Sequence, residues 1–235
     1  MLKFFRHIRQ HLLSESKFSK YMLYAIGEII LVVIGILIAL QINNWNDNRK
    51  NDIKERNVLI NLKTDLTADM QKLDTLKIQF EKAAESKEVF ESFLYYKDRI
   101  NIPLSEHFKN QFIHIWGDFN PNTITIDELK NSNSANLISN PELSRALYAL
   151  YDNYNDLSTK LKLGIERTQL MINYSSNYML HVLNPSEEDI IPMLNEKYFV
   201  NQVEANYIFG RLSAIKAARE KCQFVLDLLN KELND

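Results

Sequence analysis

The 235-residue sequence contains few of the residues that make turns and cross-links. It has five glycines, five prolines and one cysteine, Cys222. Because turns between strands depend on Gly and Pro, their scarcity favours helices over a turn-rich sheet protein. A single cysteine excludes an internal disulfide, so packing alone must hold the fold. The apolar neighbours of Cys222 at helical spacing predict a buried thiol rather than a reactive nucleophile.

Motifs that carry chemistry are also missing. The sequence has no G-x-S-x-G, no phosphate-binding loop, no G-x-G-x-x-G and no H-E-x-x-H. It also lacks the Glu-x-x-His pairs that a di-iron helical bundle requires. His7 and His11 are four residues apart, but no third metal ligand is near them, so we interpret them as a polar flank. We therefore expect no enzymatic activity, no catalytic residues, no metal and no cofactor.

The charge balance argues against nucleic acid as a partner. There are 28 Lys and Arg against 30 Asp and Glu, a net charge of −2, and acidic residues outnumber basic ones after residue 42. Proteins that bind nucleic acid obtain most of their affinity from basic patches. We expect no nucleic-acid partner.

The most distinctive feature that is present is a long apolar run over residues 21–42, whose one charged residue is Glu28. As a helix it would be about 33 Å long, enough to cross a hydrocarbon core of about 30 Å. A cleavable signal peptide would have a shorter apolar region and a small-residue cleavage site, which residues 39–43 do not provide. We predict an uncleaved signal anchor, a single transmembrane helix in the inner (plasma) membrane.

Basic residues near the two ends of the run predict its orientation. Residues 1–20 carry five Lys and Arg, and residues 43–62 carry four. Loops rich in Lys and Arg tend to stay on the cytoplasmic side. Within residues 1–13, apolar and basic side chains also lie on different helical faces, as in a helix at a lipid surface. We expect residues 1–20 to be a basic amphipathic cytoplasmic segment, with the C-terminal domain periplasmic or outside and the lipid bilayer as a partner.

Four residues of the run share one helical face, Glu28, Val32, Gly35 and Ala39. Ionisable residues inside a membrane usually face protein or water, and the small pair Gly35 and Ala39 lets a second helix come close. We interpret this face as a candidate contact surface for a membrane protein partner or a homo-oligomer. In the alternative, Glu28 is protonated or its side chain reaches the nearby interface, since it lies about 10 Å from the start of the helix. The residues leave both readings open.

After the span, a polar joint and a helical domain are predicted. Residues 43–52 are polar apart from Trp45, which suits the headgroup level, and residues 53–235 are expected to form the bundle domain. A helix over about 46–95 has apolar residues at coiled-coil spacing, interrupted by Asp69 and Lys87. These interruptions favour packing inside a bundle over a two-stranded coiled coil.

Further helices follow from caps and proline positions. The fold class is therefore all-α: one N-terminal transmembrane helix, then an elongated antiparallel helical bundle with three long helices and two short ones. The elements expected after the first long helix are a short helix over 103–116 capped by Ser105, a loop over 117–123, helical turns over 125–132, a long helix from Pro141 to about 183, a loop bracketed by Pro185 and Pro192, and a last helix over about 200–233.

Two N-terminal blocks resemble a known family. They are residues 4–9, FFRHIR, and residues 20–46, KYMLYAIGEIILVVIGILIALQINNWN. An anchor alone does not require the order of AIGE or of QINNWN. The chain is similar here to single-span membrane proteins of unknown function that are common in Bacteroidota. The resemblance implies inner-membrane placement and a helical outer domain, and it implies no reaction.

Two functions fit these observations. The first is a membrane-anchored, non-enzymatic interaction or scaffold protein of the cell envelope. The second is a ligand-sensing outer domain that signals through a separate membrane partner, because 20 residues inside the cell are too few for an output domain. Tyr148, Tyr151 and Tyr154 could line a ligand groove, but an aromatic stripe at helical spacing is expected to be core.

Overall fold

The computed structural model describes residues 18–96, 103–131 and 137–234. Within these ranges the chain is helical and has no strand, which confirms the all-α prediction. The chain divides into two compact units, residues 1–54 and residues 55–235. Residues 1–17, and with them most of the predicted amphipathic segment, lie outside the described residues.

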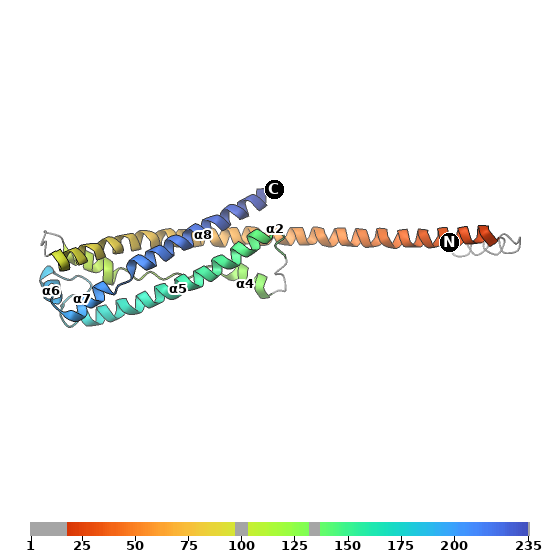
Figure 1. Ribbon diagram of the computed structural model, residues 1–235. Coiled ribbons are helices and arrows are strands. Elements are labelled where there is room, and N and C mark those ends of the chain that lie inside the picture. The colour runs from red at the N-terminus through yellow and green to blue at the C-terminus, as the bar shows by residue number, and fades with distance from the viewer. Residues whose placement is uncertain (1–17, 97–102, 132–136, 235) are drawn as a thin grey trace. The chain divides into compact units, whose positions relative to one another are not determined.

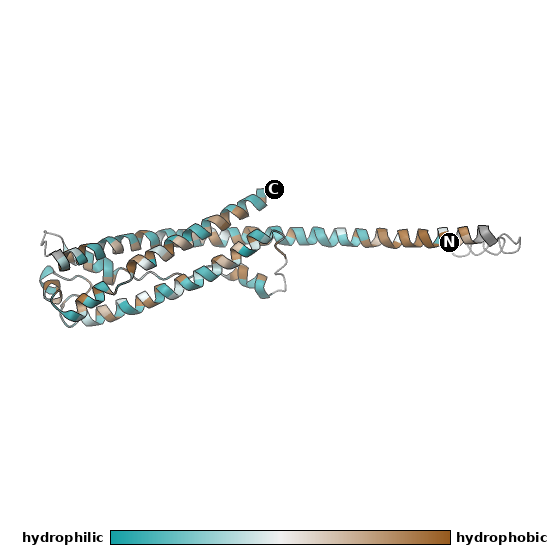
Figure 2. Cartoon of the chain, viewed as in Figure 1, coloured by the Kyte–Doolittle hydropathy of each residue, from teal (hydrophilic) through white to brown (hydrophobic). Residues whose placement is uncertain are grey.

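In the first unit, helix α2 (Phe18–Tyr96) contains the whole apolar run (Figure 1). Figure 2 shows the run as a predominantly hydrophobic stretch followed by hydrophilic turns. The helix is long and apolar enough to cross a membrane, and the described residues bury none of its most apolar window. The residues expected as a polar joint, 43–52, are also helical, with side-chain pairs from Asp47 to Asn43 and to Lys50. Such pairs three and four residues apart support a helix.

In the second unit, the rest of α2 packs with α5 (Pro141–Ser175) and α8 (Ile208–Asn234). These are the three long helices among the described residues, as the apolar spacing predicts. The apolar positions of the α2 seam are buried, from Leu59 to Phe90. The main core joins the three helices through fully or almost fully buried side chains, including Leu66, Leu73 and Phe80 of α2, Leu147, Leu150 and Tyr154 of α5, and Ile215, Cys222 and Leu229 of α8.

Helix α8 runs antiparallel to both partners. Cys222 of α8 lies against Leu66 of α2. Arg219, one turn before Cys222, pairs with Asp74, which lies two turns after Leu66. At the far end of α8, Glu232 bonds to Asn140, the residue that begins α5. The predicted antiparallel order therefore holds for α8.

Helices α2 and α5, in contrast, run parallel, which corrects the expectation of an antiparallel bundle throughout. Glu55 accepts hydrogen bonds from Ser139 just before α5, while Phe90 and Met171 share a cluster near the other end of both helices. Helix α5 can begin beside Glu55 because the segment before it has already run back along α2.

This return segment comprises residues 114–131 and 137–140, and includes α4 (Ile124–Asn131). Its contacts with α2 move steadily toward the start of the bundle. Lys72 Nζ donates to the Asn120 carbonyl at 2.8 Å, and Thr125 Oγ1 donates to Asp65 at 2.6 Å. The return segment thus takes the place of a fourth, antiparallel element.

Gly117 shows how closely the return segment approaches α2. A Cβ at this position would lie 2.7 Å from Leu76 Cδ2 and 2.8 Å from a Phe80 ring carbon. The sequence suggests Gly117 only as the end of a short helix. Its main role is instead to let the backbone cross two buried side chains.

A second core lies where α2 ends, around α3 (Leu104–Phe108), the π-helix η1 (Lys109–Ile113), α6 (Glu187–Met193) and α7 (Lys197–Glu204). Figure 1 places α6 and α7 at this end of the bundle. Four buried rings form its centre, Phe90, Phe108, Phe112 and Phe199, with centroid distances of 5.4 to 6.3 Å.

The short elements differ from the sequence predictions in several places. The predicted cap Ser105 is wrong, since Pro103 precedes α3 without a side-chain bond, and Ser105 N–H donates to Glu187 instead. Helix α5 ends at Ser175 rather than near 183, because Ser176 and Asn177 bond back to carbonyls of the last turn.

The predicted loop between Pro185 and Pro192 contains α6. Ser186 and Asp189 form a reciprocal capping box that starts this helix, and Pro192 fits in its last turn. Short helices are thus more numerous than the two expected.

The predicted helix over 200–233 is interrupted between α7 and α8, at residues 205–207. Lys87 donates to the carbonyls of Val203 and Glu204, and Arg167 donates to that of Ala205. Side chains from other helices therefore satisfy the last carbonyls of α7, which allows the chain to turn there.

Candidate functional site

The predicted contact face of the apolar run, Glu28, Val32, Gly35 and Ala39, lies on one stretch of α2. Val32 is 55% exposed, and Ala39 is also exposed. A Cβ added at Gly35 would meet no heavy atom within 4 Å. Glycine inside a helix costs about 1 kcal/mol relative to alanine, and the described residues of this chain do not need the space, so their packing gives no reason for Gly35.

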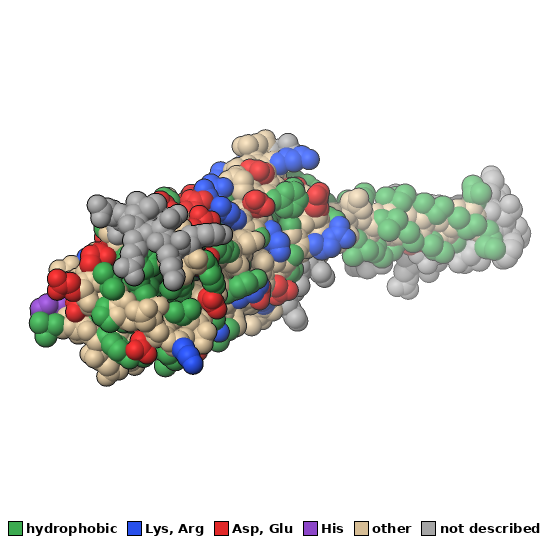
Figure 3. Space-filling view, turned by 60° about the vertical axis from the view of Figure 1, so that its left-hand side comes forward, with side chains coloured by type: hydrophobic (Ala, Val, Ile, Leu, Met, Phe, Trp, Pro, Cys, Tyr) green, Lys and Arg blue, Asp and Glu red, His purple; other side chains and the backbone are tan. Residues whose placement is uncertain are grey.

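Figure 3 contrasts the surfaces of the two units. Apolar side chains cover the run of α2 in the first unit, whereas acidic and basic side chains are spread over the visible face of the second. Trp45, three residues beyond the run, is 65% exposed. Exposed indole rings are typical of the boundary between lipid and water.

In the second unit, Asp69 is the first polar interruption of the α2 seam, and it is fully buried. Its carboxylate accepts the backbone N–H of Asn122 at 3.0 and 3.1 Å, the Asn122 side-chain amide at 3.0 Å and Lys72 Nζ at 3.0 Å. Tyr151 donates to the Asn122 carbonyl at 2.9 Å. Burial raises the pKa of Asp69 despite these hydrogen bonds. Asp69 thus fixes the return segment to α2.

Lys87, the second interruption, is 5% exposed. Its ammonium donates to the carbonyls of Val203 at 2.8 Å and Glu204 at 3.0 Å, and pairs with Glu91 at 3.1 Å. A cation at the carboxyl end of a helix also opposes the negative pole of the helix dipole. Both interruptions of the seam therefore have a structural role. Asp69 binds the return segment and Lys87 binds the end of α7, and the position of neither segment could be predicted from helical periodicity.

Cys222 and two of the three tyrosines are core residues, as the sequence predicts. Tyr151, Tyr154 and Cys222 are buried, while Tyr148 is half-buried. The Cys222 thiol donates to the Leu66 carbonyl at 3.5 Å, and burial raises its pKa to about 11. A buried thiol with a raised pKa is a poor nucleophile at neutral pH.

This burial predicts the reactivity of Cys222. In the folded full chain, its reaction with a maleimide at pH 7 is expected to be at least about 100-fold slower than in denaturant, because only the exposed thiolate reacts. The measurement is labelling over time by mass spectrometry. A double variant, Cys222→Ala with Ser176→Cys, supplies an exposed control thiol. Equal labelling rates for the two thiols would contradict the burial.

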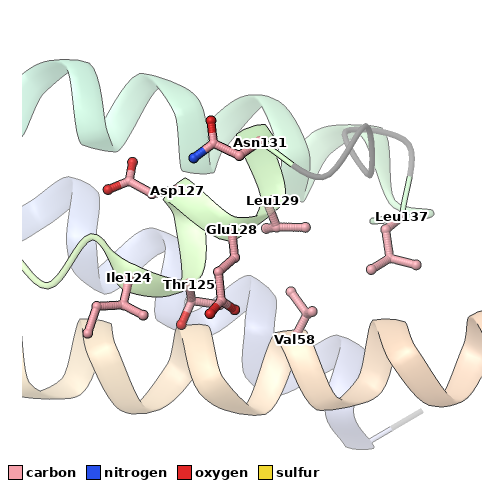
Figure 4. A pocket seen from close by; sticks show the side chains of 8 residues that line it. All are labelled: Val58, Ile124, Thr125, Asp127, Glu128, Leu129, Asn131 and Leu137. Atoms are coloured by element: carbon pink, nitrogen blue, oxygen red, sulfur yellow. The ribbon is translucent and has the colours of Figure 1, made fainter.

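An open groove of about 690 Å³ lies between α2 and α4 in the second unit (Figure 4). Val58, Leu129 and Leu137 give it apolar walls. Asp127 and Glu128 add two carboxylates. The described residues contain no cluster of three or more His, Cys, Asp and Glu that could hold a metal ion. The groove therefore suits an apolar side chain flanked by a basic group.

Sequence reasoning missed Asn122 and the groove. Asn122 acts through its backbone N–H as well as its side chain, and a loop asparagine looks the same whether or not a distant carboxylate binds it. The one indication in the sequence was Asp69, a polar residue inside an apolar seam. That position does not indicate the partner of Asp69, because Asn122 is 53 residues away in the sequence.

Residues 28–159 match a family of unknown function (DUF6090). The matched range includes the predicted contact face, Asp69 and the return segment, and ends within α5. Comparison of the chain with curated proteins and with solved structures finds no match.

Proposed function

The chain belongs to this family of unknown function, DUF6090, and from its own residues we propose that it is a membrane-anchored, non-enzymatic interaction or scaffold protein of the cell envelope. The observation that carries the proposal is α2, in which one helix of 79 residues supplies both the apolar run and the first core helix of the bundle. The described residues leave the most apolar window of the run exposed, and in this proposal lipid or another protein covers it. In this proposal the span lies in the plasma membrane, with residues 1–20 cytoplasmic and the bundle outside.

The engagement of the buried reactive groups supports a non-enzymatic role. Asp69 binds the return segment, Lys87 binds the end of α7, and the Cys222 thiol lies against a carbonyl of α2. Each of these groups holds two elements of the fold together.

Two surfaces would meet partners. Within the membrane, the face of Glu28, Val32, Gly35 and Ala39 would receive a second helix, because small residues allow close helix packing. Outside it, the groove between α2 and α4 would take an apolar side chain next to a basic one, matching its apolar walls and the carboxylates of Asp127 and Glu128.

Replacing Gly35 with leucine tests the membrane surface. We expect Gly35→Leu to reduce recovery of the cross-linked partner or homo-oligomer by about tenfold, because a bulky residue separates helices that small residues bring together. The measurement is cross-linking of the full chain in native membranes, affinity purification and quantitative mass spectrometry.

The matched control is Gly27→Leu. Gly27 lies in the same helix with equally open surroundings, but roughly 80° around the axis from Gly35. Unchanged assembly in Gly35→Leu, or equal loss in both variants, would refute a specific contact face.

A further inference from the structure

A second groove, of about 400 Å³, lies between α5 and the start of α8. Its walls include Leu163, Gly164 and Arg167 from α5 and Tyr207, Gly210 and Arg211 from the other side. Pockets for small molecules begin at about 300 Å³ and are mostly apolar with a few placed polar groups. The groove therefore has the size and the mixed lining of a small-molecule site.

Arg211 is the unusual residue of this groove, because it is charged yet only 5% exposed. Its guanidinium lies 5.4 Å from the centre of the Phe80 ring. Nη2 donates to Asn206 Oδ1 at 2.5 Å, whereas Nη1 is buried without a hydrogen-bond partner. The ion pairs of the described residues do not include Arg211. A buried cation without a counter-charge is unfavourable, because burial removes its hydration without replacing it.

Arg167 adds a second positive charge to the same groove. Arg167 donates a hydrogen bond to the Ala205 carbonyl, a neutral acceptor. Burial, and to a smaller extent the charge of Arg167, lowers the pKa of Arg211 to about 10. Lys160, the third cation of the lining, already pairs with Asp156 at 2.6 Å. The groove thus holds two guanidinium groups and, among the described residues, no carboxylate paired with either.

Two glycines make room for the groups that shape the groove. A Cβ at Gly164 would lie 1.7 Å from Arg211 Nη1 and 2.8 Å from its Cζ. A Cβ at Gly210 would lie 1.8 Å from the Tyr207 ring. Gly164 lies inside α5 and Gly210 is the third residue of α8, and glycine weakens a helix relative to alanine. The chain therefore accepts two helix-weakening residues to seat a guanidinium and an aromatic ring.

We propose that the groove between α5 and α8 binds a small organic anion, a carboxylate with an apolar body, through Arg211 and Arg167. A planar carboxylate matches the planar guanidinium and supplies the missing counter-charge. Leu163 and Tyr207, which are 56% and 74% exposed, give the apolar body surfaces to cover. Such a site would serve the sensing role that the sequence allows, and it does not rest on the proposed scaffold role.

Fluorine NMR of the full chain in lipid nanodiscs tests the proposal, with 4-(trifluoromethyl)benzoate as the probe. We expect the benzoate signal to broaden with added wild-type protein, and the neutral isostere 4-(trifluoromethyl)benzamide to bind at least about tenfold more weakly. Arg167→Gln and Arg211→Met are each expected to weaken benzoate binding about tenfold or more, because each removes a charge-assisted hydrogen bond to the carboxylate.

The matched control is Arg145→Gln, which removes an exposed arginine from the same helix outside the groove and should leave binding unchanged. Because Arg211→Met removes a buried group, the Arg167 variant provides the second test: its side chain is exposed, and glutamine can still donate a hydrogen bond to the Ala205 carbonyl. Equal binding of benzoate and benzamide, or equal benzoate binding by wild type and Arg167→Gln, would overturn the proposal.

Discussion

Phe199→Ala is expected to destabilise the second core by about 3–5 kcal/mol, the range for removing a buried aromatic side chain. Phe199 is fully buried, and its ring lies 5.8 to 6.3 Å from those of Phe90, Phe108 and Phe112. It is the α7 residue of this four-ring centre, so its loss leaves a cavity between α2, η1 and α7. Hydrogen exchange of the full chain in nanodiscs should show faster exchange in α3, α6 and α7 than in α5 and α8.

Phe224→Ala is the matched control, since Phe224 lies in α8 and is 50% exposed. Surface substitutions of this kind usually change stability by less than about 0.5 kcal/mol. If the two variants exchanged alike, or if Phe199→Ala opened the whole bundle uniformly, the second core would not be a separate packing unit.

Asp69→Leu is expected to cost about 2–4 kcal/mol, although it would make the apolar seam of α2 continuous. The substitution removes the acceptor of the half-buried Asn122 backbone N–H and one of the two acceptors of its side-chain amide, which keeps the Asp65 carbonyl. Each group left unsatisfied costs about 1–3 kcal/mol. The measurement is urea-dependent pulse proteolysis of the full chain, with cleavage in the return segment read by mass spectrometry. A more stable Asp69→Leu protein would show that the aspartate is not an anchor.

Asp69→Asn separates the hydrogen bonds from the charge. The amide oxygen can still accept from Asn122, so this variant should lose less stability than Asp69→Leu. The folded pKa of Asp69 is raised above 3.8, so its contribution to stability is largest below pH 3.8 and is lost as the pH rises through the folded value. The stability of wild type relative to Asp69→Asn should therefore fall across that interval. A difference that grows in favour of wild type with rising pH would contradict the raised pKa.

The long helices could be predicted from sequence because each carries a local, repeated pattern. The seam of α2 repeats over many turns, and the cap of α5 at Asn140 and Pro141 is contained in adjacent residues. The buried face of a helix follows from such spacing alone.

The remaining elements depend on residues far away in sequence. The break between α7 and α8 is held by Lys87 and Arg167, which are 116 and 38 residues from the carbonyls that they bind. The parallel order of α2 and α5 depends on Asp69 and Asn122, and the groove of Arg211 depends on Gly164 in another helix. Local patterns cannot indicate such pairs, because each partner has an ordinary local sequence.

The position of α8 late in the sequence affects folding during synthesis. The Leu66 carbonyl of α2 meets the thiol of Cys222, which is 156 residues later in the chain. At roughly 5–20 residues per second, the ribosome needs about 8–30 s to synthesise that interval. During this time the apolar seam of α2 lacks its last covering helix. Newly made chains are therefore most exposed to aggregation and proteolysis before α8 emerges, and a factor that covers the α2 seam would act in that interval.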